Sequence, residues 1–494
     1  MSTGEEAGPA LAGGSGGPGA LRPLVETVLD ALAAGAARRG GPVAAGGPGR
    51  SAEAVARALR DESPDALRRL TELLAHGSAD PADPACAAHL HCPPLAVAVA
   101  ADLAVSALNP SQDSWDQAPA ATALETALIA ELAELVGFDP LRAAGVLTSG
   151  GTESNLMGLM LARDQILDGI VELDGLPAGA RPRIFASQAA HFSVQRAAAL
   201  LGLGERAVVS VPVDRELRMD PDALARAMAE TIWEGATPLA VVATAGTTDT
   251  GAVDPLHRAA DLAARYGAWL HVDAAYGGGA LLSERLAPLL DGIARADSVS
   301  LDWHKLGWQP AAAGVFLARR AESYVSLLRR AVYLNPADDE EAGYPSLLGL
   351  SLRTTRRADA FKLAVTLRTL GRSGLGRLVD RCHDLALATA EAVRAEPALE
   401  LHCEPILTTV VFRHLPPGTG PAAADGLNGR LRRSLLSEGR AVVGRTELPG
   451  SGPGRVRLKL TLLNPYATPA DTAAVLRAVV RAGRETGSDP SGQG

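Results

Sequence analysis

The hydrophobic and polar positions of the chain follow two alternating periods from about residue 120 onward. Short runs of apolar and β-branched residues have the pattern of buried strands, and the segments between them carry apolar residues at the spacing of amphipathic helices. RPRIFAS (181–187), PLAVVATA (238–245) and AWLHVDAA (268–275) are typical of such strands. Strands that alternate with helices of about 10–15 residues predict right-handed crossovers and a mostly parallel sheet covered on both faces. The pattern therefore predicts an α/β fold.

Further segments extend this region in both directions. Strands are also predicted at 206–213, 298–303 and 313–319, and helices at 121–137, 191–203, 220–235, 254–267 and 351–371. In open sheets of this kind, ligands bind in the crevice outside the carboxyl ends of the strands. We therefore expect the functional residues at those ends.

The pattern changes after residue 371. Strands of a smaller sheet are predicted at 399–405, 408–415, 439–448 and 454–463, interleaved with helices at 375–395, 421–438 and 468–486. At the other end, two helical patterns precede the main domain and cannot bury their apolar faces alone. The expected organisation is a disordered tail (1–20), an N-terminal helical segment (21–110), a large domain (111–372), a small C-terminal α+β domain (373–486) and a second disordered tail (487–494).

Composition excludes several classes of protein. The chain has 494 residues, of which 47% are hydrophobic and 21% charged, as in ordinary globular proteins. Its net charge of -9 provides no basic surface for nucleic acid or an anionic membrane. No apolar run reaches the ~18 residues of a membrane-spanning helix, so we expect a cytoplasmic protein. The four cysteines lack the spacing of a metal site, which predicts reduced thiols and no metal.

Lysine is rare in this sequence, which draws attention to each one. Only Lys305, Lys362 and Lys459 occur, against dozens of arginines. Lys305 follows the strand-like run SVSLDW and lies in SVSLDWHKLGWQP. A primary amine can condense with an aldehyde, whereas a guanidinium cannot, so Lys305 is a candidate for covalent catalysis. The alternative is a solvated surface lysine.

Four other stretches fall where strands should end. TSGGTESN (148–155) has a glycine pair at the start of a helix, where backbone N–H groups would receive a phosphate; such turns also occur as plain connections. HVDAAYGGG (271–279) places Asp273 at the end of an apolar strand, either as a functional or as a satisfied structural carboxylate. AHFSVQ (190–195) places His191 between a strand and a helix. TAGTTDTGAVDP (244–255) is a hydroxyl-rich turn.

Taken together, these residues fit one ligand, pyridoxal 5′-phosphate. That cofactor needs an amine for its aldehyde, a cradle for its phosphate, a carboxylate to keep its ring nitrogen protonated, and flat packing on its ring. The residues that meet these needs, in the same order, are Lys305, the Gly150–Gly151–Thr152 turn, Asp273 and His191.

The same motifs carry a resemblance to a known family. TSGGTESN, AHFS, TAGTTDTGAVDP, HVDAAYGG and DSVSLDWHK resemble, in the family's order, the pyridoxal-phosphate decarboxylases of the glutamate and aromatic-amino-acid decarboxylase group. HLHCPPL (89–95), NPSQDSWDQAPAATALE (109–125), YLNP (333–336), SLRTTRRADAFKL (351–363) and RLKLTLLNP (457–465) are most similar to the branch that acts on L-2,4-diaminobutyrate or on lysine and ornithine. The resemblance covers residues 85–480.

The resemblance implies a fold of the aspartate-aminotransferase type and a homodimer with active sites at the subunit interface. It also implies that Lys305 forms the covalent link with the cofactor, that Asp273 pairs with the ring nitrogen and that His191 stacks on the ring. The remaining cofactor contacts implied by it are Ala275 on the other face of the ring, Ser149, Gly150, Gly151, Thr152 and His304 around the phosphate, and Thr247 near the ring.

Residues 332–347 (VYLNPADDEEAGYPSL) correspond, by the same resemblance, to a mobile loop that brings a tyrosine to the reacting carbon. Gly343, two prolines and a run of acids suit such a loop, and Tyr344 is its candidate catalytic tyrosine. The alternatives are protonation by His191 or by water, and an ordinary acidic surface loop.

The sequence thus predicts an amino-acid α-decarboxylase that releases carbon dioxide from a small-molecule diamino acid. Alternatives are a decarboxylase of aspartate, glutamate or an aromatic amino acid, one diverted to oxidative deamination, or a catalytically silent homologue that acts as a binding partner. A site for a terminal ammonium group needs a carboxylate. Asp113 and Asp116 are candidates for it, and helix capping is their alternative role.

Overall fold

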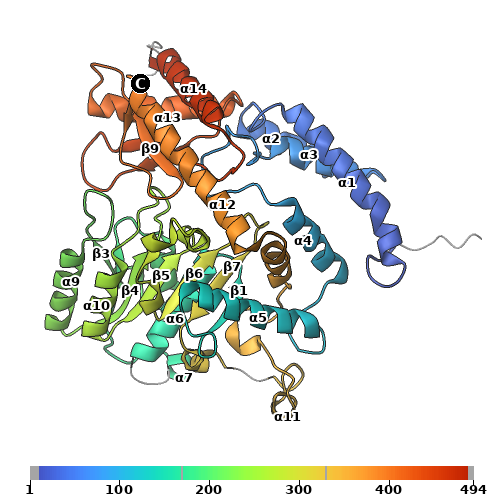
Figure 1. Ribbon diagram of the computed structural model, residues 1–494, viewed down its shortest axis with the longest axis vertical. Coiled ribbons are helices and arrows are strands. Elements are labelled where there is room, and N and C mark those ends of the chain that lie inside the picture. The colour runs from blue at the N-terminus through green and yellow to red at the C-terminus, as the bar shows by residue number, and fades with distance from the viewer. Residues whose placement is uncertain (1–9, 168–170, 329–330, 488–494) are drawn as a thin grey trace, which may run out of the picture.

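The computed structural model describes residues 10–167, 171–328 and 331–487 (Figure 1). Within these residues, the larger sheet has seven strands in the order β1-β7-β6-β5-β4-β2-β3. Their bounds are β1 Ala144–Thr148, β2 Pro182–Ser187, β3 Val208–Val211, β4 Thr237–Thr244, β5 Trp269–Ala274, β6 Ser298–Asp302 and β7 Gly314–Ala318. Of the strands, only β1 was not among the predicted segments.

The direction of the strands places six of their seven carboxyl ends at one edge of the sheet. Neighbouring strands from β6 to β3 pair in parallel, whereas β7 is antiparallel to both β6 and β1. The prediction of a mostly parallel sheet is therefore confirmed. Because β7 is antiparallel to both of its neighbours, β1 runs the same way as β6, and the carboxyl ends of β1 to β6 lie at one edge of the sheet.

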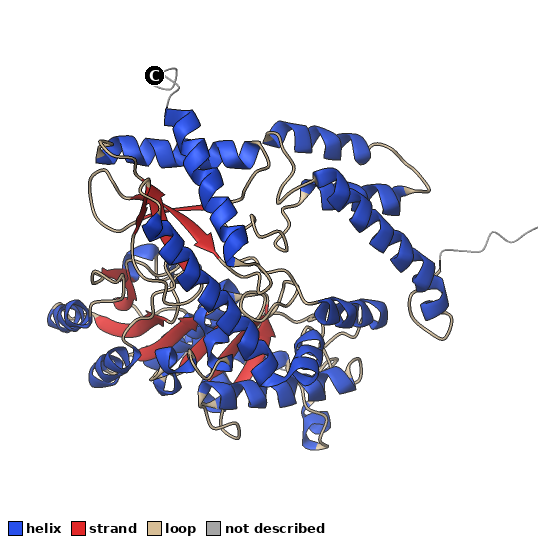
Figure 2. Cartoon of the chain, turned by 45° about the horizontal axis from the view of Figure 1, so that its top comes forward, coloured by secondary structure: helices blue, strands red, loops and turns tan. Residues whose placement is uncertain are grey.

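Helices cover both faces of the sheet, as Figure 2 shows. Successive strand residues point to opposite faces, so that Ile184 packs in the core under α6 (Gly151–Ile166) and α8 (Ser193–Leu200), while Phe185 packs in the core on the other face. That second face is covered by α5 (Pro119–Val136), α9 (Pro221–Trp233), α10 (Leu256–Tyr266) and part of α12 (Ala360–Ala395). Two short helices, α7 (Val171–Asp174) and α11 (Ala337–Glu341), lie outside these layers.

A second, smaller sheet follows in the chain, as predicted. It has the order β10-β11-β9-β8, with every pair antiparallel. Its elements are β8 Leu399–Leu401, β9 Thr409–His414, α13 Pro421–Ser437, β10 Gly444–Glu447, β11 Val456–Thr461 and α14 Pro469–Gly487. A separate hydrophobic cluster fills the space between this sheet and the helices α13 and α14.

The long helix α12 joins the two sheets (Figure 1). It breaks at Gly371, whose φ of 67° and ψ of 168° are not helical, so two helical pieces meet there. The predicted domain boundary between residues 372 and 373 stays a prediction, and this break supports it. The predicted helix at 351–371 was too long at its start, because residues 351–359 form irregular structure before α12 begins at Ala360.

The N-terminal segment forms four helices within the described residues, α1 (Gly17–Arg39), α2 (Pro48–Ala58), α3 (Ala66–Gly77) and α4 (Ala96–Leu108). The expected tail at 1–20 is corrected at its end, because Gly17–Ala20 already belong to α1; residues 1–9 lie outside the described residues. Likewise Gly487 ends α14, and residues 488–494 lie outside. No helix in the described ranges is long and apolar enough to cross a membrane.

A buried ion pair fixes the edge strand β1. Glu125 on α5 accepts a hydrogen bond from Arg356 at 2.6 Å and another from the backbone N–H of Leu147 at 3.1 Å. The side chains of Arg356 and Glu125 are only 2% and 1% exposed. The backbone carbonyl of Leu147 also has a charged partner, because it accepts a hydrogen bond from Arg353 at 3.0 Å. Charged side chains thus occupy the outward backbone groups of an edge strand, which would otherwise lack partners.

This geometry predicts an asymmetric response to mutation. Arg356→Met leaves the Glu125 carboxylate buried and uncompensated, and should lower the free energy of unfolding by about 3 kcal/mol or more. Arg368→Met breaks the exposed pair with Glu131, whose side chains are 68% and 47% exposed, and should change it by less than about 0.5 kcal/mol. Urea unfolding followed by tryptophan fluorescence measures both. Equal changes in the free energy of unfolding for the two variants would contradict the larger contribution that we expect from the buried pair.

Candidate active site

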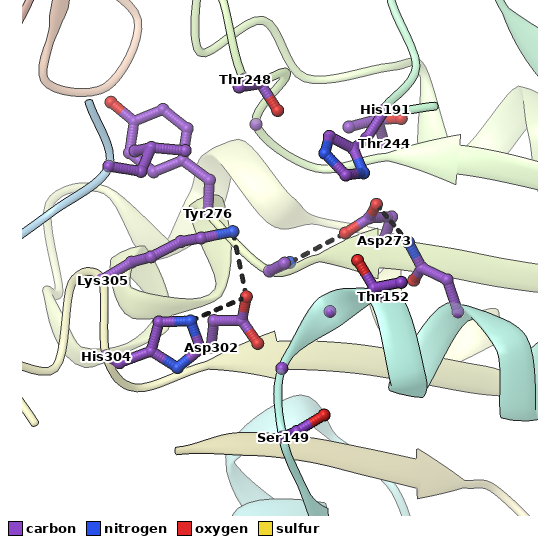
Figure 3. A pocket seen from close by; sticks show the side chains of 16 residues that line it. Ser149, Thr152, His191, Thr244, Thr248, Asp273, Tyr276, Asp302, His304 and Lys305 are labelled. Carbon is purple, nitrogen blue, oxygen red and sulfur yellow. Dashed lines mark hydrogen bonds and ion pairs between the residues drawn. The ribbon is translucent and has the colours of Figure 1, made fainter. Parts of the chain in front are cut away.

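A cavity of about 370 Å³ opens at this carboxyl-end edge of the larger sheet. Its wall comes from segments that are far apart in sequence, and Figure 3 shows their side chains converging on one space. The lining residues are Leu90, Ser149, Gly150, Gly151, Thr152, Asn155, His191, Thr244, Gly246, Thr248, Asp273, Ala275, Tyr276, Asp302, His304 and Lys305. Nine of the residues proposed from the sequence are therefore brought together.

Lys305 follows β6 and faces a second acid in the cavity. Its Nζ lies 3.0 Å from Oδ2 of Asp302, the last residue of that strand, and the Lys305 side chain is 18% exposed (Figure 3). The backbone N–H of Lys305 donates to the Asp302 carbonyl at 3.2 Å, so a tight turn directs the side chain back over the strand end. The amine is thus held inside the protein and not in bulk solvent.

The glycine turn after β1 makes room for a ligand against this pair. Gly150 has a φ of 147°, a conformation that favours glycine, and a Cβ on Gly151 would lie 2.9 Å from the Cβ of Ala275 and 3.3 Å from Asp302 Oδ2. Glu153 in the first turn of α6 accepts from the Ser149 N–H at 2.7 Å and is held by Arg353 at 3.0 Å. The turn therefore has a fixed shape that ends at the N-terminus of a helix, where an anion is favoured.

Asp273, near the end of β5, is a buried carboxylate surrounded by donors. Asn155 donates to its Oδ2 at 2.7 Å, and the Ala275 N–H donates to its Oδ1 at 3.1 Å. The single hydrogen of the Ser300 hydroxyl is shared between this Oδ1, at 3.3 Å, and Asn155 Oδ1, at 2.9 Å. Hydrogen bonds to a carboxylate favour its charged form. Among the described residues no lysine, arginine or histidine forms an ion pair with Asp273, so its charge is available to a ligand in the cavity.

Two histidines line the same space. Burial lowers the pKa of His191 below its ordinary value, against an opposing effect of Asp273. Burial likewise lowers the pKa of His304, against an opposing effect of Asp302. His304 Nδ1 accepts from the Ala313 N–H at 3.2 Å, and its ring lies close to the turn, since a Cβ on Gly150 would be 3.2 Å from its Cε1. Both imidazoles are therefore neutral at pH 7.

Two predicted residues do not lie on this cavity. Thr247 is buried in the turn after β4, where its hydroxyl bonds to Thr250 at 2.8 Å and accepts from the Ala252 N–H at 3.1 Å, and the next residue, Thr248, lines the cavity instead. Tyr344 is 46% exposed and packs on Trp115, with ring centroids 4.9 Å apart, beside a second cavity. In its own chain Tyr344 thus does not line the cavity that contains Lys305.

The structure adds residues that sequence reasoning missed. Asp302 is a buried acid beside Lys305, and its Oδ1 has no hydrogen-bond partner within the described residues. Asn155 reaches Asp273 from α6, and Tyr276 bonds to Thr408 and Thr409 of the small sheet region. The sequence signal for Asp302 was its position three residues before Lys305 at a strand end. Asn155 carried none beyond its place in the TSGGTESN motif.

The residues present fit pyridoxal phosphate. A buried amine, a glycine turn at a helix N-terminus, and a carboxylate without a cationic partner among the described residues surround one cavity of suitable size. Ala275 and His191 come from different segments and can cover the two faces of a flat ring. The fold and site define an enzyme of the aspartate-aminotransferase structural type, fold type I of the pyridoxal-phosphate enzymes.

Comparison with known proteins specifies the family. The model of the pyridoxal-dependent decarboxylase conserved domain matches residues 51–415, and the chain belongs to that family. It is a carboxy-lyase that uses pyridoxal phosphate. The chain is 41% identical to L-2,4-diaminobutyrate decarboxylase of Acinetobacter baumannii over 81% of this chain and 80% of the relative. It is 44% identical to the Rhizobium meliloti enzyme of the same name over 81% and 78%.

Solved structures agree with the family. The glutamate decarboxylase domain of diaminobutyrate-pyruvate transaminase and L-2,4-diaminobutyrate decarboxylase from Vibrio parahaemolyticus matches with a TM-score of 0.85 and 33% identity, covering 96% of this chain and 98% of that one. Mouse CSAD matches with a TM-score of 0.86 and 28% identity, covering 94% and 99%. The fold predicted from the sequence is confirmed.

The glycine turn can be tested through cofactor affinity. Gly150→Ala places a side chain at a strained φ and against His304, and should weaken pyridoxal phosphate binding by about tenfold or more, as expected for roughly 1–3 kcal/mol of strain. Gly267→Ala is the control, because Gly267 also has a positive φ, of 65°, but caps α10 with open space around it. Absorbance titration with the cofactor measures the affinity, and thermal unfolding without it measures the backbone cost. Unchanged affinity in the Gly150 variant would exclude this turn as a cofactor contact.

Proposed function

We propose that the protein is a pyridoxal-phosphate-dependent α-decarboxylase of an L-diamino acid, with L-2,4-diaminobutyrate as the first candidate and lysine or ornithine next. The observation that carries this proposal is the convergence of Lys305, Asp273 and His191 on one cavity with the 149–152 turn. The names of the two relatives with more than 40% identity support the choice of diaminobutyrate. A silent homologue would have no reason to keep this set of residues.

Pyridoxal phosphate supplies an aldehyde that condenses with amines and a ring that draws electrons away from the substrate's α-carbon. In the proposed roles, Lys305 would hold the cofactor through its primary amine, which can condense with the aldehyde. The 149–152 turn and His304 surround the phosphate. Asp273 keeps the proton on the ring nitrogen, because a charged carboxylate stabilises it there. His191 and Ala275 would pack against the two faces of the ring, and Thr248 would lie near it, where the resemblance implied Thr247.

Loss of carbon dioxide leaves an electron pair at the α-carbon, which must receive a proton while water is excluded. We propose Tyr344 as the donor, acting on the cavity of a second copy of the chain, since in its own chain it lies beside a different cavity. His191 is the alternative donor, because it already lines the cavity.

A homodimer is part of this proposal. The N-terminal helices expose large apolar side chains that a second subunit would cover, and Figure 1 shows α1, α2 and α3 at one side of the molecule, away from the larger sheet. These exposed residues are Leu24, Leu29 and Leu32 on α1, Leu67, Leu70 and Leu74 on α3, and Val99, Leu103 and Leu108 on α4. We place the enzyme in the cytoplasm, where free thiols such as its four described cysteines persist.

The second cavity offers a carboxylate for the distal ammonium group of the substrate. Asp113 accepts hydrogen bonds from Ser111 at 2.6 Å and from Thr355 at 3.1 Å, and Asp116 accepts one from the Ser114 hydroxyl. Of the two, Asp116 is exposed and lines the second cavity with Trp115 and Tyr344. If the loop of one subunit closes over the cavity of the other, Asp116 is the better placed of the two candidates.

Substrate and mechanism are tested together with purified protein and added cofactor. Release of carbon dioxide from a panel of amino acids should be fastest for 2,4-diaminobutyrate, and Lys305→Ala should lower it by several orders of magnitude while circular dichroism stays unchanged. A wild-type rate in this variant would overturn the assignment of Lys305. Fastest turnover of glutamate, aspartate or an aromatic amino acid would replace the diamino acid as substrate.

Mixed dimers test the position of Tyr344. Tyr344→Phe alone should lower the share of turnovers that end in amine and raise the share that ends in carbonyl product and pyridoxamine phosphate. When chains carrying Lys305→Ala and chains carrying Tyr344→Phe are combined with separate tags, one site of each hybrid keeps both native residues only if the loop acts between subunits. The hybrid should then recover roughly half of the wild-type amine yield. No recovery would place Tyr344 in its own subunit's site, and normal yield in the single variant would leave His191 as the donor.

A further inference from the structure

Asn155 lies on α6 at the centre of the buried polar groups behind the cavity. Its Nδ2 donates to Asp273 Oδ2 at 2.7 Å and to the Ser193 hydroxyl at 2.9 Å. Its Oδ1 accepts from His271 Nε2 at 2.9 Å and from the Ser300 hydroxyl at 2.9 Å. The side chain is 1% exposed and uses both of its donors and both lone pairs.

The amide can adopt only one of its two orientations. With Nδ2 and Oδ1 exchanged, the carbonyl oxygen would lie 2.7 Å from a carboxylate oxygen of Asp273, where two acceptors would repel each other. The Asp273 carboxylate therefore fixes the orientation of Asn155, and Asn155 directs a hydrogen-bond donor at the carboxylate.

The partners of Asn155 fix the direction of the hydrogen bonds behind it. Because Asn155 Oδ1 carries no hydrogen, His271 Nε2 must be the protonated ring nitrogen, and His271 Nδ1 accepts from the Ser298 hydroxyl at 2.8 Å. The Ser298 oxygen in turn accepts from Trp269 Nε1 at 2.8 Å. Burial lowers the pKa of His271 to about 4, so this ring stays neutral at pH 7.

The same direction continues toward the cavity. Since the Ser193 oxygen accepts from Asn155, its own hydrogen is free to bond to His191 Nδ1, 2.9 Å away, and the Ser193 N–H also donates to that nitrogen at 3.3 Å. His191 Nδ1 is therefore an acceptor. In the neutral imidazole the hydrogen must then be on Nε2, the nitrogen that this network does not occupy.

We propose that Asn155, held by His271, is a positioning residue that controls both ends of the cofactor site: it keeps Asp273 charged toward the ring nitrogen and keeps His191 in the Nε2–H tautomer. This inference rests on the proposed function, because it assigns Asp273 and His191 the roles given there. It adds a physical cause for those roles. The hydrogen bonds from the Trp269 indole through Ser298, His271 and Asn155 all donate in the same direction, toward Asp273 and His191. Removing one donor from a buried charged group typically costs a factor of about 10 to 100 in an equilibrium constant.

Asn155→Asp tests the first end, because it keeps the size of the side chain and its two acceptor contacts with His271 and Ser300. It places a second carboxylate 2.7 Å from Asp273, and two such groups cannot both remain ionised. We expect pyridoxal phosphate to bind about 10- to 100-fold more weakly. The nitrogen-15 resonance of ring-labelled cofactor should also move from the protonated toward the neutral position.

Asn428→Asp is the matched control. Asn428 is equally buried, bonds to His414 and Ala424 in the small sheet region, and lies away from the cavity. It should lose stability but keep the wild-type cofactor affinity and ring resonance.

Ser193→Ala tests the second end, because it breaks the link to His191 and leaves the Asn155 donor to Asp273 in place. This variant should leave the nitrogen-15 resonance of the cofactor ring unchanged and shift the imidazole nitrogen-15 signal of His191. The His191 signal is identified as the one missing from the spectrum of His191→Gln.

The possible results separate this inference from the function it rests on. A wild-type protein that neither binds pyridoxal phosphate nor releases carbon dioxide would overturn the proposed function. A working wild type with unchanged affinity and ring resonance in Asn155→Asp would leave that function standing and overturn the role of Asn155. An unchanged His191 signal in Ser193→Ala would remove the tautomer from the proposal. If Asn155→Asp does not fold, His271→Phe takes its place, because it removes the donor that holds the Asn155 amide. This variant should show a smaller shift of the ring resonance in the same direction. No shift in His271→Phe would also overturn the inference.

Discussion

The active site depends on one constraint, which is that strands running in the same direction present their carboxyl ends at one edge of a sheet. The glycine turn after β1, the hydroxyl turn after β4, Asp273 near the end of β5 and Lys305 beyond β6 come from segments scattered over more than a hundred residues, and only the sheet brings them together. The antiparallel strand β7 preserves this arrangement, because it separates β1 from β6 without reversing one relative to the other. The buried pair of Arg356 and Glu125 then holds β1, an edge strand, in position.

Sequence reasoning worked where a local pattern determines the outcome. The strands ending near Asp273 and Lys305 are continuous apolar runs, so their ends, and the residues at those ends, could be located from periodicity and motifs alone. The predicted place of Thr247 near the ring stays a prediction. The structure puts Thr248 in the cavity lining, because Thr247 closes the turn on Thr250 and Ala252, and no local pattern indicates which residue of a turn faces inward. Tyr344 was placed by resemblance, and its packing on Trp115 depends on contacts that no local pattern records.

The residues missed from the sequence share a physical feature. Asn155 forms hydrogen bonds to side chains on other elements, and Asp302 pairs with Lys305 because the turn after β6 directs that side chain back over the strand end, so both contacts depend on how the chain folds. A buried amide or acid in a sequence looks the same whether it is satisfied by its own helix or by a distant strand. Fully satisfied polar networks rigidify a site and partly satisfied ones destabilise it, so the roles of these residues follow from their partners and not from their identity.

The three lysines of the chain show how far the rarity of a residue type can be used to identify a catalytic residue. All three have mostly buried side chains, and each is paired with aspartate: Lys305 with Asp302, Lys362 with Asp102 and Asp359, and Lys459 with Asp249. Rarity therefore reflects a common preference for a compact ammonium group in buried pairs, and it does not by itself single out Lys305. What distinguishes Lys305 is its surroundings. Among the described lysines it is the one that lines the cavity with Asp273, His191 and the glycine turn, so that its amine can exchange a carboxylate partner for an aldehyde carbon.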